Sequence, residues 1–213
     1  DFGGRLDNHS VDIDLEITVT DTANHRESID DGVTVAEKPL LIEAVPEAGQ
    51  LRRGLDDRVY LDVTYPDGVA AQVALTVTDE YSQTFTATTD AYGLAVITLT
   101  TPNTGFTPLR VTADDGRGHV VQQPLVLASD FGTGTASVLL RPDRVEYHVG
   151  DTLNVDILTA SSAGFVDTVY LDIIKDRQSF GLVALPVSDN VAQAAIPLDG
   201  SLLGTLELDA YTV

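Results

Sequence analysis

Hydrophobic residues alternate with polar ones along most of this chain. Over residues 11–19, Val, Ile and Leu occupy every second position, and Asp, Glu and Thr occupy the positions between them. A period of two places alternate side chains on opposite faces of a β-strand, so this segment predicts a half-buried strand. A turn at Thr22-Ala23-Asn24-His25 and a returning strand over 32–35 complete a predicted hairpin. No segment of useful length has helical periodicity, and the pattern predicts an all-β fold.

One sequence phrase occurs twice with different residues: a segment that leads into a strand, a turn centred on Gly, and a strand with alternating apolar residues. Residues 51–63 read LRRGLDDRVYLDV, and residues 145–157 read VEYHVGDTLNVDI. Further strands and turns follow each copy, so the repeating unit is a domain of roughly 80 to 100 residues, the size of a small β-sandwich. The sequence therefore predicts tandem immunoglobulin- or fibronectin-like sandwiches.

Turns and a Gly-rich linker set the expected domain boundaries. We expect the last hairpin of a truncated domain over 1–38, a sandwich over 39–128 and a second sandwich over 136–213. The linkers 35–39 and 128–136 are the expected hinges. Because an isolated hairpin is marginal in water, its apolar face is expected to need cover from the next domain or another copy. The predicted sandwich strands are 40–45, 58–64, 72–78, 84–88, 95–100, 108–113, 120–127, 137–140, 152–158, 166–176, 180–186, 191–196 and 205–211.

The chain is strongly acidic, with Asp+Glu 33 against Lys+Arg 12 and a formal net charge of -21. Most acids fall at alternate strand positions and in turns, which is typical of a solvated outer face; a salt-adapted organism or an acidic external surface stays open as an additional explanation. Nucleic acid and anionic membranes bind Lys and Arg, so neither is an expected partner. No apolar run reaches the roughly 20 residues of a membrane helix. The absence of Cys and Met predicts no disulfide or thiolate site, and a mature product or excised piece.

Few residues are candidates for chemistry. The four histidines, His9, His25, His119 and His148, have no neighbour at metal-ligand spacing, so they are interpreted as surface or turn residues. The run Asp114-Asp115-Gly116-Arg117-Gly118 could offer oxygens to Ca²⁺, but it lacks the alternating ligands and downstream Glu of an EF-hand, and a turn is favoured. No nucleophile elbow or phosphate loop occurs. The sequence predicts no catalytic, metal or cofactor site and no enzyme.

The seven tyrosines could instead line a sugar-binding face. They are scattered along the chain and Trp is absent. Tyr60 and Tyr147 are expected at sandwich corners or rims, where a phenol can pack and still reach a hydrogen-bond partner.

Four phrases, in this order, resemble the macroglobulin domains of the α2-macroglobulin family. They are Val19-Thr20-Asp21-Thr22-Ala23-Asn24-His25, Gly54-Leu55 before Val59-Tyr60-Leu61, Thr89-Asp90-Ala91-Tyr92-Gly93-Leu94-Ala95, and Tyr147-His148-Val149-Gly150-Asp151-Thr152-Leu153. The order is similar to the end of the third macroglobulin domain followed by the fourth and fifth. Val149 and Asp56 stand where family members commonly carry Pro. The lack of Cys and the acidity are similar to bacterial or archaeal members.

The resemblance implies a segment of a large, broad-spectrum protease inhibitor. Members of this family trap a protease when it cuts a bait segment and the macroglobulin domains rearrange around it; many also carry a Cys-x-x-Gln thioester. This chain has no Cys and no long bait-like segment, so it is expected to supply scaffold alone. The implied partners are proteases, through the parent protein, and neighbouring macroglobulin domains. The implied location is extracellular or periplasmic, with anchoring to the cell envelope through the parent.

A second class stays open: Ig-like spacer repeats in the stalk of a bacterial surface adhesin. Fold alone does not separate the two classes. Stalk repeats are usually alike, whereas the two units here differ in length, turns and ending, which favours the inhibitor.

Overall fold

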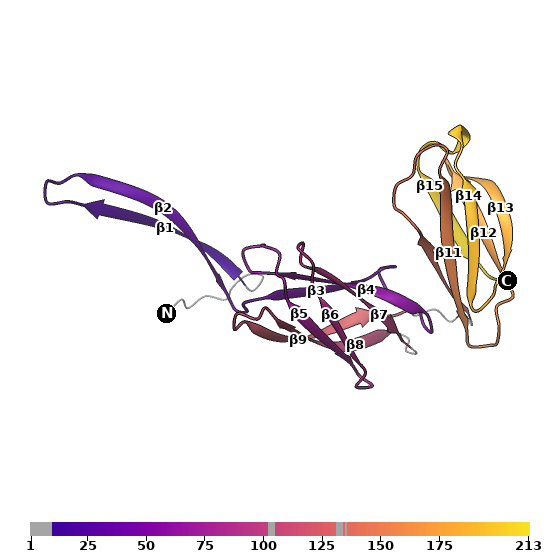
Figure 1. The fold of residues 1–213 in the computed structure, drawn as a ribbon, viewed down its shortest axis with the longest axis horizontal. Coiled ribbons are helices and arrows are strands. Elements are labelled where there is room, and N and C mark those ends of the chain that lie inside the picture. The colour runs from indigo at the N-terminus through magenta and orange to yellow at the C-terminus, as the bar shows by residue number, and fades with distance from the viewer. Residues whose placement is uncertain (1–9, 102–104, 131–133, 135) are drawn as a thin grey trace. The chain divides into compact units, whose positions relative to one another are not determined.

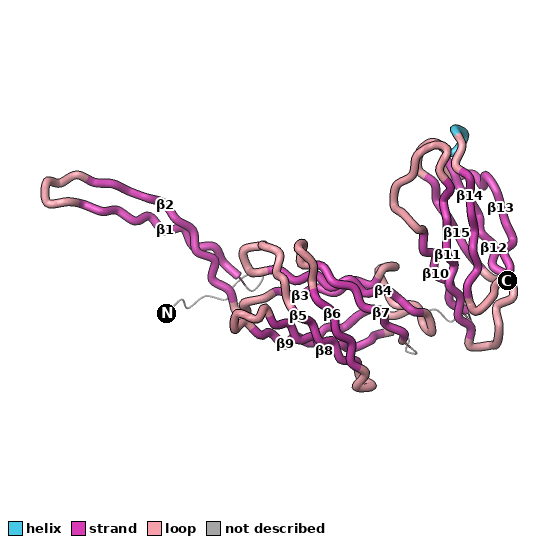
Figure 2. Tube along the Cα trace, in the orientation of Figure 1, coloured by secondary structure: helices cyan, strands magenta, loops and turns pink. Residues whose placement is uncertain are grey.

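The structure is a computed structural model that describes residues 10–101, 105–130, 134 and 136–213. The regular secondary structure of the described residues is almost entirely β-strand, as Figures 1 and 2 show. The first nine strands are β1 (Ser10–Thr20), β2 (Arg26–Ala36), β3 (Leu41–Pro46), β4 (Asp56–Thr64), β5 (Ala74–Asp79), β6 (Thr84–Thr88), β7 (Leu94–Thr100), β8 (Phe106–Asp114) and β9 (Val120–Ala128). The remaining strands are β10 (Ala136–Pro142), β11 (Thr152–Ser161), β12 (Thr168–Lys175), β13 (Gln178–Pro186), β14 (Val191–Pro197) and β15 (Leu206–Tyr211).

Every strand predicted between residues 40 and 211 is present, with ends that differ by a few residues at most. The returning strand of the first hairpin is longer than predicted, because β2 pairs with β1 from Arg26 onward. The one helical element in the described ranges is a short 3₁₀ turn, Gly200–Leu202. None of these residues forms a helix of the length and apolarity that crossing a bilayer requires.

The strands described assemble into five sheets. β1 pairs with β2 alone; β3-β4-β7 and β6-β5-β8-β9 are three- and four-stranded sheets. Two more three-stranded sheets, β10-β11-β14 and β13-β12-β15, follow. Seven strands split three and four are typical of a fibronectin-like sandwich, and the prediction of an all-β, Ig- or fibronectin-like fold is confirmed.

The chain divides into two compact units. Unit 1 contains Asp1–Val45, Val59–Ile97 and Pro108–Val126; unit 2 contains Pro46–Arg58, Thr98–Thr107 and Leu127–Val213.

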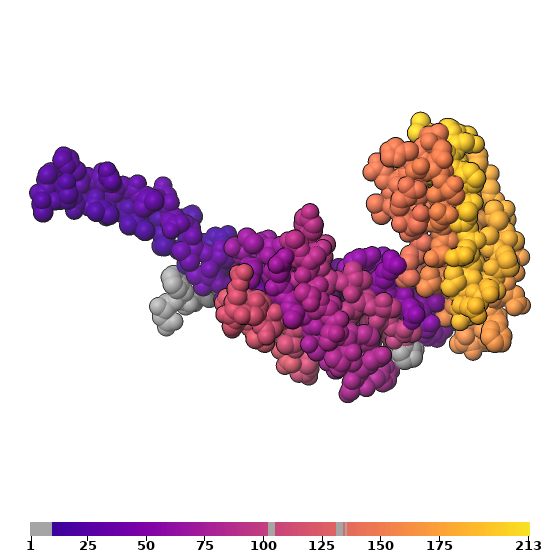
Figure 3. Space-filling view, viewed as in Figure 1, coloured from indigo at the N-terminus to yellow at the C-terminus, as the bar shows by residue number. Residues whose placement is uncertain are grey.

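The β1–β2 hairpin of unit 1 places its apolar residues on one face, as the alternation predicts. Register pairs Val11 with Val35 and Ile17 with Ile29 on that face. The prediction that this face is half-buried is wrong: Ile17 is 47% and Val19 is 66% exposed. The hairpin is the indigo surface in Figure 3. Because the sheet has only two strands, no second layer of described residues covers its apolar face.

The core of unit 1 consists of the apolar residues of alternating strands whose inward face is buried. The inward residues of β4, β5 and β8, among them Leu61, Val77 and Val111, are fully buried. The outward neighbours on the same strands are mostly exposed. Apolar burial of this kind contributes roughly 25 cal/mol per Å² and is the main source of stability.

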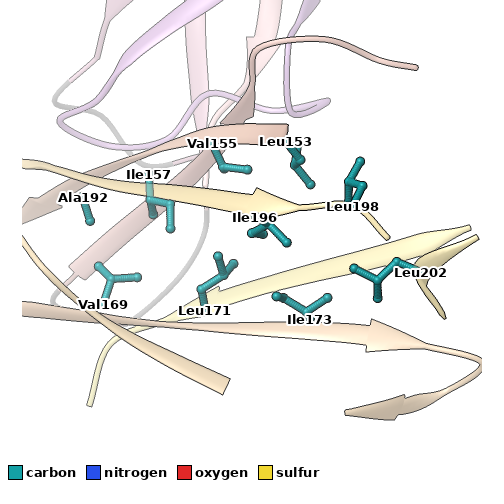
Figure 4. Close-up of a cluster of buried hydrophobic side chains, with 10 residues drawn as sticks. All are labelled: Leu153, Val155, Ile157, Val169, Leu171, Ile173, Ala192, Ile196, Leu198 and Leu202. Atoms are coloured by element: carbon teal, nitrogen blue, oxygen red, sulfur yellow. The ribbon is translucent and has the colours of Figure 1, made fainter. Parts of the chain in front are cut away.

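The C-terminal sandwich of unit 2 holds a second core. Side chains of β11 and β12 point toward one another across it, as Figure 4 shows. The cluster consists of Leu153, Val155, Ile157, Val169, Leu171, Ile173, Ala192, Ile196, Leu198 and Leu202. Both sheets of this sandwich therefore bury one face, as the period of two predicts.

Candidate functional site: a charged junction in unit 2

A buried carboxylate interrupts the apolar face of β4. The inward positions of this strand and its lead-in are Leu55, Asp57, Val59, Leu61 and Val63, and all five are buried, with Asp57 0% exposed. When the two repeated phrases are superposed on Gly54 and Gly150, Asp57 corresponds to Leu153 of the C-terminal core. An acid therefore stands where the pattern calls for an apolar residue.

The Asp57 carboxylate has incomplete hydrogen bonding. Its Oδ2 accepts a 2.7 Å hydrogen bond from the backbone N–H of Arg52. Its Oδ1 is buried and has no hydrogen-bond partner among the residues that the structure describes; the same is true of Arg52 Nε. A buried polar atom without a partner costs on the order of 1–3 kcal/mol, so such atoms are uncommon and informative.

Next to Asp57, an ion pair joins the end of β3 to β10. Arg141 Nε donates to Glu47 Oε2 at 3.0 Å, and Arg141 Nη2 donates to Glu47 Oε1. The same Nη2 donates to the backbone oxygen of Asp56 at 2.9 Å. The side chain of Arg141 is only 18% exposed and that of Glu47 only 11%. A bidentate, largely buried Arg–carboxylate pair has fixed geometry, so it holds the segment 46–58 against β10.

Backbone hydrogen bonds and side-chain contacts also join residues 51–53 to the end of β9 and the residues that follow it. Leu51 N donates to Ala128 O and Asp130 N donates to Leu51 O, both at 2.8 Å. Arg52 Nη1 contacts Asp130 Oδ2 at 3.4 Å. Arg53 Nη2 donates to Gly134 O at 2.9 Å. Hydrogen bonds therefore hold the start of the expected 128–136 hinge in place. Residues 131–133 and 135 lie outside the described residues.

The Gly corner of the first phrase packs against β11. Gly54 has a φ of +76°, and a Cβ there would lie 3.2 Å from the Cβ of Ala160. Its N–H donates to Thr101 O at 2.8 Å. We define the junction as Glu47, Arg52, Asp57, Asp130 and Arg141.

The surroundings of Asp57 raise its pKa to about 6. Burial is the main cause, because removal from water disfavours the charged form. The hydrogen bond from Arg52 lowers the pKa, the nearby Glu47 carboxylate raises it, and the Arg52 and Arg141 guanidiniums lower it. The junction can therefore do two things chemically: hold two segments together and exchange a proton in mild acid.

Our reading of the sequence does not single out Asp57. The signal that could have found it is the phase of the alternation, since Val59, Leu61 and Val63 place residue 57 on the core face. Glu47 and Arg141 carry no such signal, because their pairing joins residues 94 positions apart.

Three of the candidate histidines lie in turns. His25 Nδ1 contacts Asp21 at 3.0 Å, and His119 Nδ1 contacts Asp115 at 2.7 Å. The backbone N–H of His148 donates to Asp151 at 2.9 Å. His9 lies outside the described residues. The described ranges contain no group of His, Cys, Asp or Glu arranged to hold a metal ion.

One turn design, with an Asp at its first position, recurs in three hairpins and in the β6–β7 connection between two sheets. The Asp side chain accepts from the backbone N–H groups two and four residues later, as Asp115 does from Arg117 and His119. The fourth residue has positive φ, as Asn24 and Gly93 do. The four turns begin at Asp21, Asp79, Asp90 and Asp115. The Asp114-Asp115 run is thus part of a turn, and both carboxylate oxygens of Asp115 accept hydrogen bonds from protein groups.

Two tyrosine clusters are resolved. The Tyr147 hydroxyl donates to Asp143 at 2.5 Å and accepts from Arg144 N at 3.0 Å, while the Arg144 guanidinium lies 4.7 Å from the ring centre. Tyr147 is therefore a rim residue with hydrogen-bond partners, as predicted. Tyr60 differs from expectation, since it lies within β4 and is 40% exposed. Tyr170 and Tyr211 stack across β12 and β15 with ring centres 5.7 Å apart.

No protein-family model matches the sequence, and no curated protein matches it. Among solved structures, trypsin-activated α2-macroglobulin from Escherichia coli is similar over 97% of this chain and 18% of that chain, with 14% identity and a TM-score of 0.33. A Salmonella α2-macroglobulin mutant matches over 95% and 19%, with 10% identity and a TM-score of 0.31. This chain thus spans less than a fifth of either α2-macroglobulin chain.

Two-domain fragments of other proteins match similarly. The N-terminal two-Ig module of a Drosophila receptor protein tyrosine phosphatase matches over 73% of this chain and 82% of that chain, with 15% identity and a TM-score of 0.32. Scores this low do not establish a shared arrangement, and the fold class rests on the strands and sheets themselves.

Proposed function

We propose that this chain is a non-catalytic scaffold segment of an α2-macroglobulin-like protease inhibitor, acting outside the cytoplasm. The supporting observation is the junction, where an ion pair, backbone bonds and the Gly54 corner hold segment 46–58 to β10, β11 and the residues after β9. A joint held at several points transmits the movement of one part of a chain to the next, as a trapping scaffold requires.

The order of the four macroglobulin-like phrases favours an inhibitor over other scaffolds. The division into 1–38, 39–128 and 136–213 stays a prediction, as does rearrangement around a protease. The competing proposal is a spacer in an adhesin stalk, with which Ig-like domains are equally compatible.

The test mixes the full-length protein with a broad-specificity protease and compares cleavage of a large protein substrate with that of a small peptide. An inhibitor that traps by enclosure protects the large substrate and leaves cleavage of the small one unchanged. Equal cleavage of both substrates would contradict trapping and favour the stalk.

A junction variant links this result to the chain. Arg141→Ala removes the bidentate contact with Glu47 and should weaken protection of the large substrate. The matched control is Arg110→Ala, since Arg110 is exposed and donates only a 3.4 Å bond to Gln122 in the described contacts. Full protection by Arg141→Ala would mean that the junction takes no part in trapping.

A further inference from the structure

We propose that the junction is a proton-binding site: in mild acid Asp57 takes up a proton, and the protonated junction is the more stable form. The inference does not depend on protease trapping. It starts from geometry, since a fully buried carboxylate with one unpartnered oxygen occupies a core position.

Among the described residues, Asp57 shares the guanidiniums that face it with other carboxylates. Glu47 approaches from the end of β3, Arg52 from the corner before β4, and Arg141 from β10. Each guanidinium already contacts another carboxylate: Arg141 pairs with Glu47, and Arg52 pairs with Asp130. Three carboxylates thus share two guanidiniums, and a proton on Asp57 balances the cluster.

The repeated phrase supports the same conclusion. The equivalent position in the second copy is Leu153, which is buried in the core cluster. A neutral side chain is therefore compatible with this corner of the fold, whereas an ionised carboxylate there bears the cost of leaving water.

Linkage fixes the direction of the effect. The pKa of Asp57 is raised from 3.8 to about 6 in the folded chain, so the folded state binds the proton about a hundredfold more tightly than an exposed Asp does. Stability from this site should rise as pH falls from about 6 to about 4, and the contribution is absent at neutral pH. Turn acids with a lowered pKa, such as Asp115, reduce stability as pH falls, but they do so at lower pH, where they become protonated.

The direct test is an NMR titration of the Asp57 carboxyl carbon in the full chain, assigned by its loss in Asp57→Asn. We expect a midpoint near 6. In Glu47→Gln the midpoint should fall, because the repelling carboxylate is gone. A wild-type midpoint at or below about 4, the ordinary Asp value, would overturn the proposal; so would a midpoint that Glu47→Gln leaves unchanged.

Stability measurements give an independent readout. Asp57→Asn and Asp57→Leu should raise the urea midpoint of unfolding at pH 7.5, and the difference from wild type should shrink at pH 4.5. The matched control is Asp62→Asn, an exposed acid on the outward face of the same strand, which should follow wild type at both pH values. Curves for Asp57→Asn and wild type that stay parallel across this range would contradict proton uptake by Asp57.

Discussion

Strands β1 and β11 carry the same alternation of apolar and polar residues, yet their apolar faces differ in burial. In β11, Leu153, Val155 and Ile157 are at most 5% exposed, because β12 and its neighbours form an opposing sheet. In β1, Leu15 and Ile17 are 41% and 47% exposed, because the hairpin is a sheet of two strands. Alternation therefore sets which face is apolar, whereas burial depends on a second layer.

The largest expected contrast is between matched Leu→Ala substitutions. Leu171→Ala removes a fully buried side chain and should lower the free energy of unfolding of the C-terminal sandwich by about 2–5 kcal/mol. Leu15→Ala removes an exposed one and should change stability by no more than about 0.5 kcal/mol. Urea unfolding of both variants measures the difference. Equal losses would mean that the hairpin face is covered in solution.

A second contrast concerns the turns. Gly93→Ala should cost roughly 1–3 kcal/mol because of its positive φ, and more because the new Cβ would lie 2.4 Å from Val63 O. Asn24→Ala changes the equivalent position of the hairpin turn, where φ is 68°, and should cost about 1 kcal/mol. Thermal unfolding compares the two. If Asn24→Ala were the costlier change, the local environment of the sandwich turn would not matter.

A smaller effect on stability is expected when the Asp at the first position of a turn is replaced. Burial acts to raise the pKa of Asp115, but hydrogen bonds from Arg117, His119 and Tyr65 outweigh it and lower the pKa to about 2. The stability that this carboxylate contributes is present above about pH 4 and is lost as pH falls toward 2.

Asp115→Asn should therefore melt below wild type at pH 7, by a margin that closes as pH approaches 2. Asp21→Asn, in the exposed hairpin turn, should show a smaller margin. Melting curves between pH 7 and pH 2 test both variants, and a margin for Asp115→Asn that does not depend on pH would contradict the role of its charge.

The smallest expected effect is that of salt. The net charge of -21 produces self-repulsion, which added NaCl screens. The melting temperature should rise between low and molar salt, and amide exchange should slow more in the acidic β1–β2 hairpin than in the C-terminal sandwich. A melting temperature that does not change would count against self-repulsion.

Much of the fold could be predicted because strands and turns are encoded locally. The alternation around Leu61 and Leu171 and the Asp-initiated turns at Asp90 and Asp115 each depend on a few neighbouring residues. The junction could not be predicted in the same way. Glu47 and Arg141 are far apart in sequence, and pairing across that distance has no local pattern.

The sequence by itself determined the β class, the approximate position of the strands and the apolar face of every alternating segment, because these follow from a side-chain period of two. Tertiary structure alone decided which faces become core and what surrounds Asp57. Burial and the shift of a pKa depend on atoms brought together from distant segments, as Glu47, Arg52 and Arg141 are around Asp57.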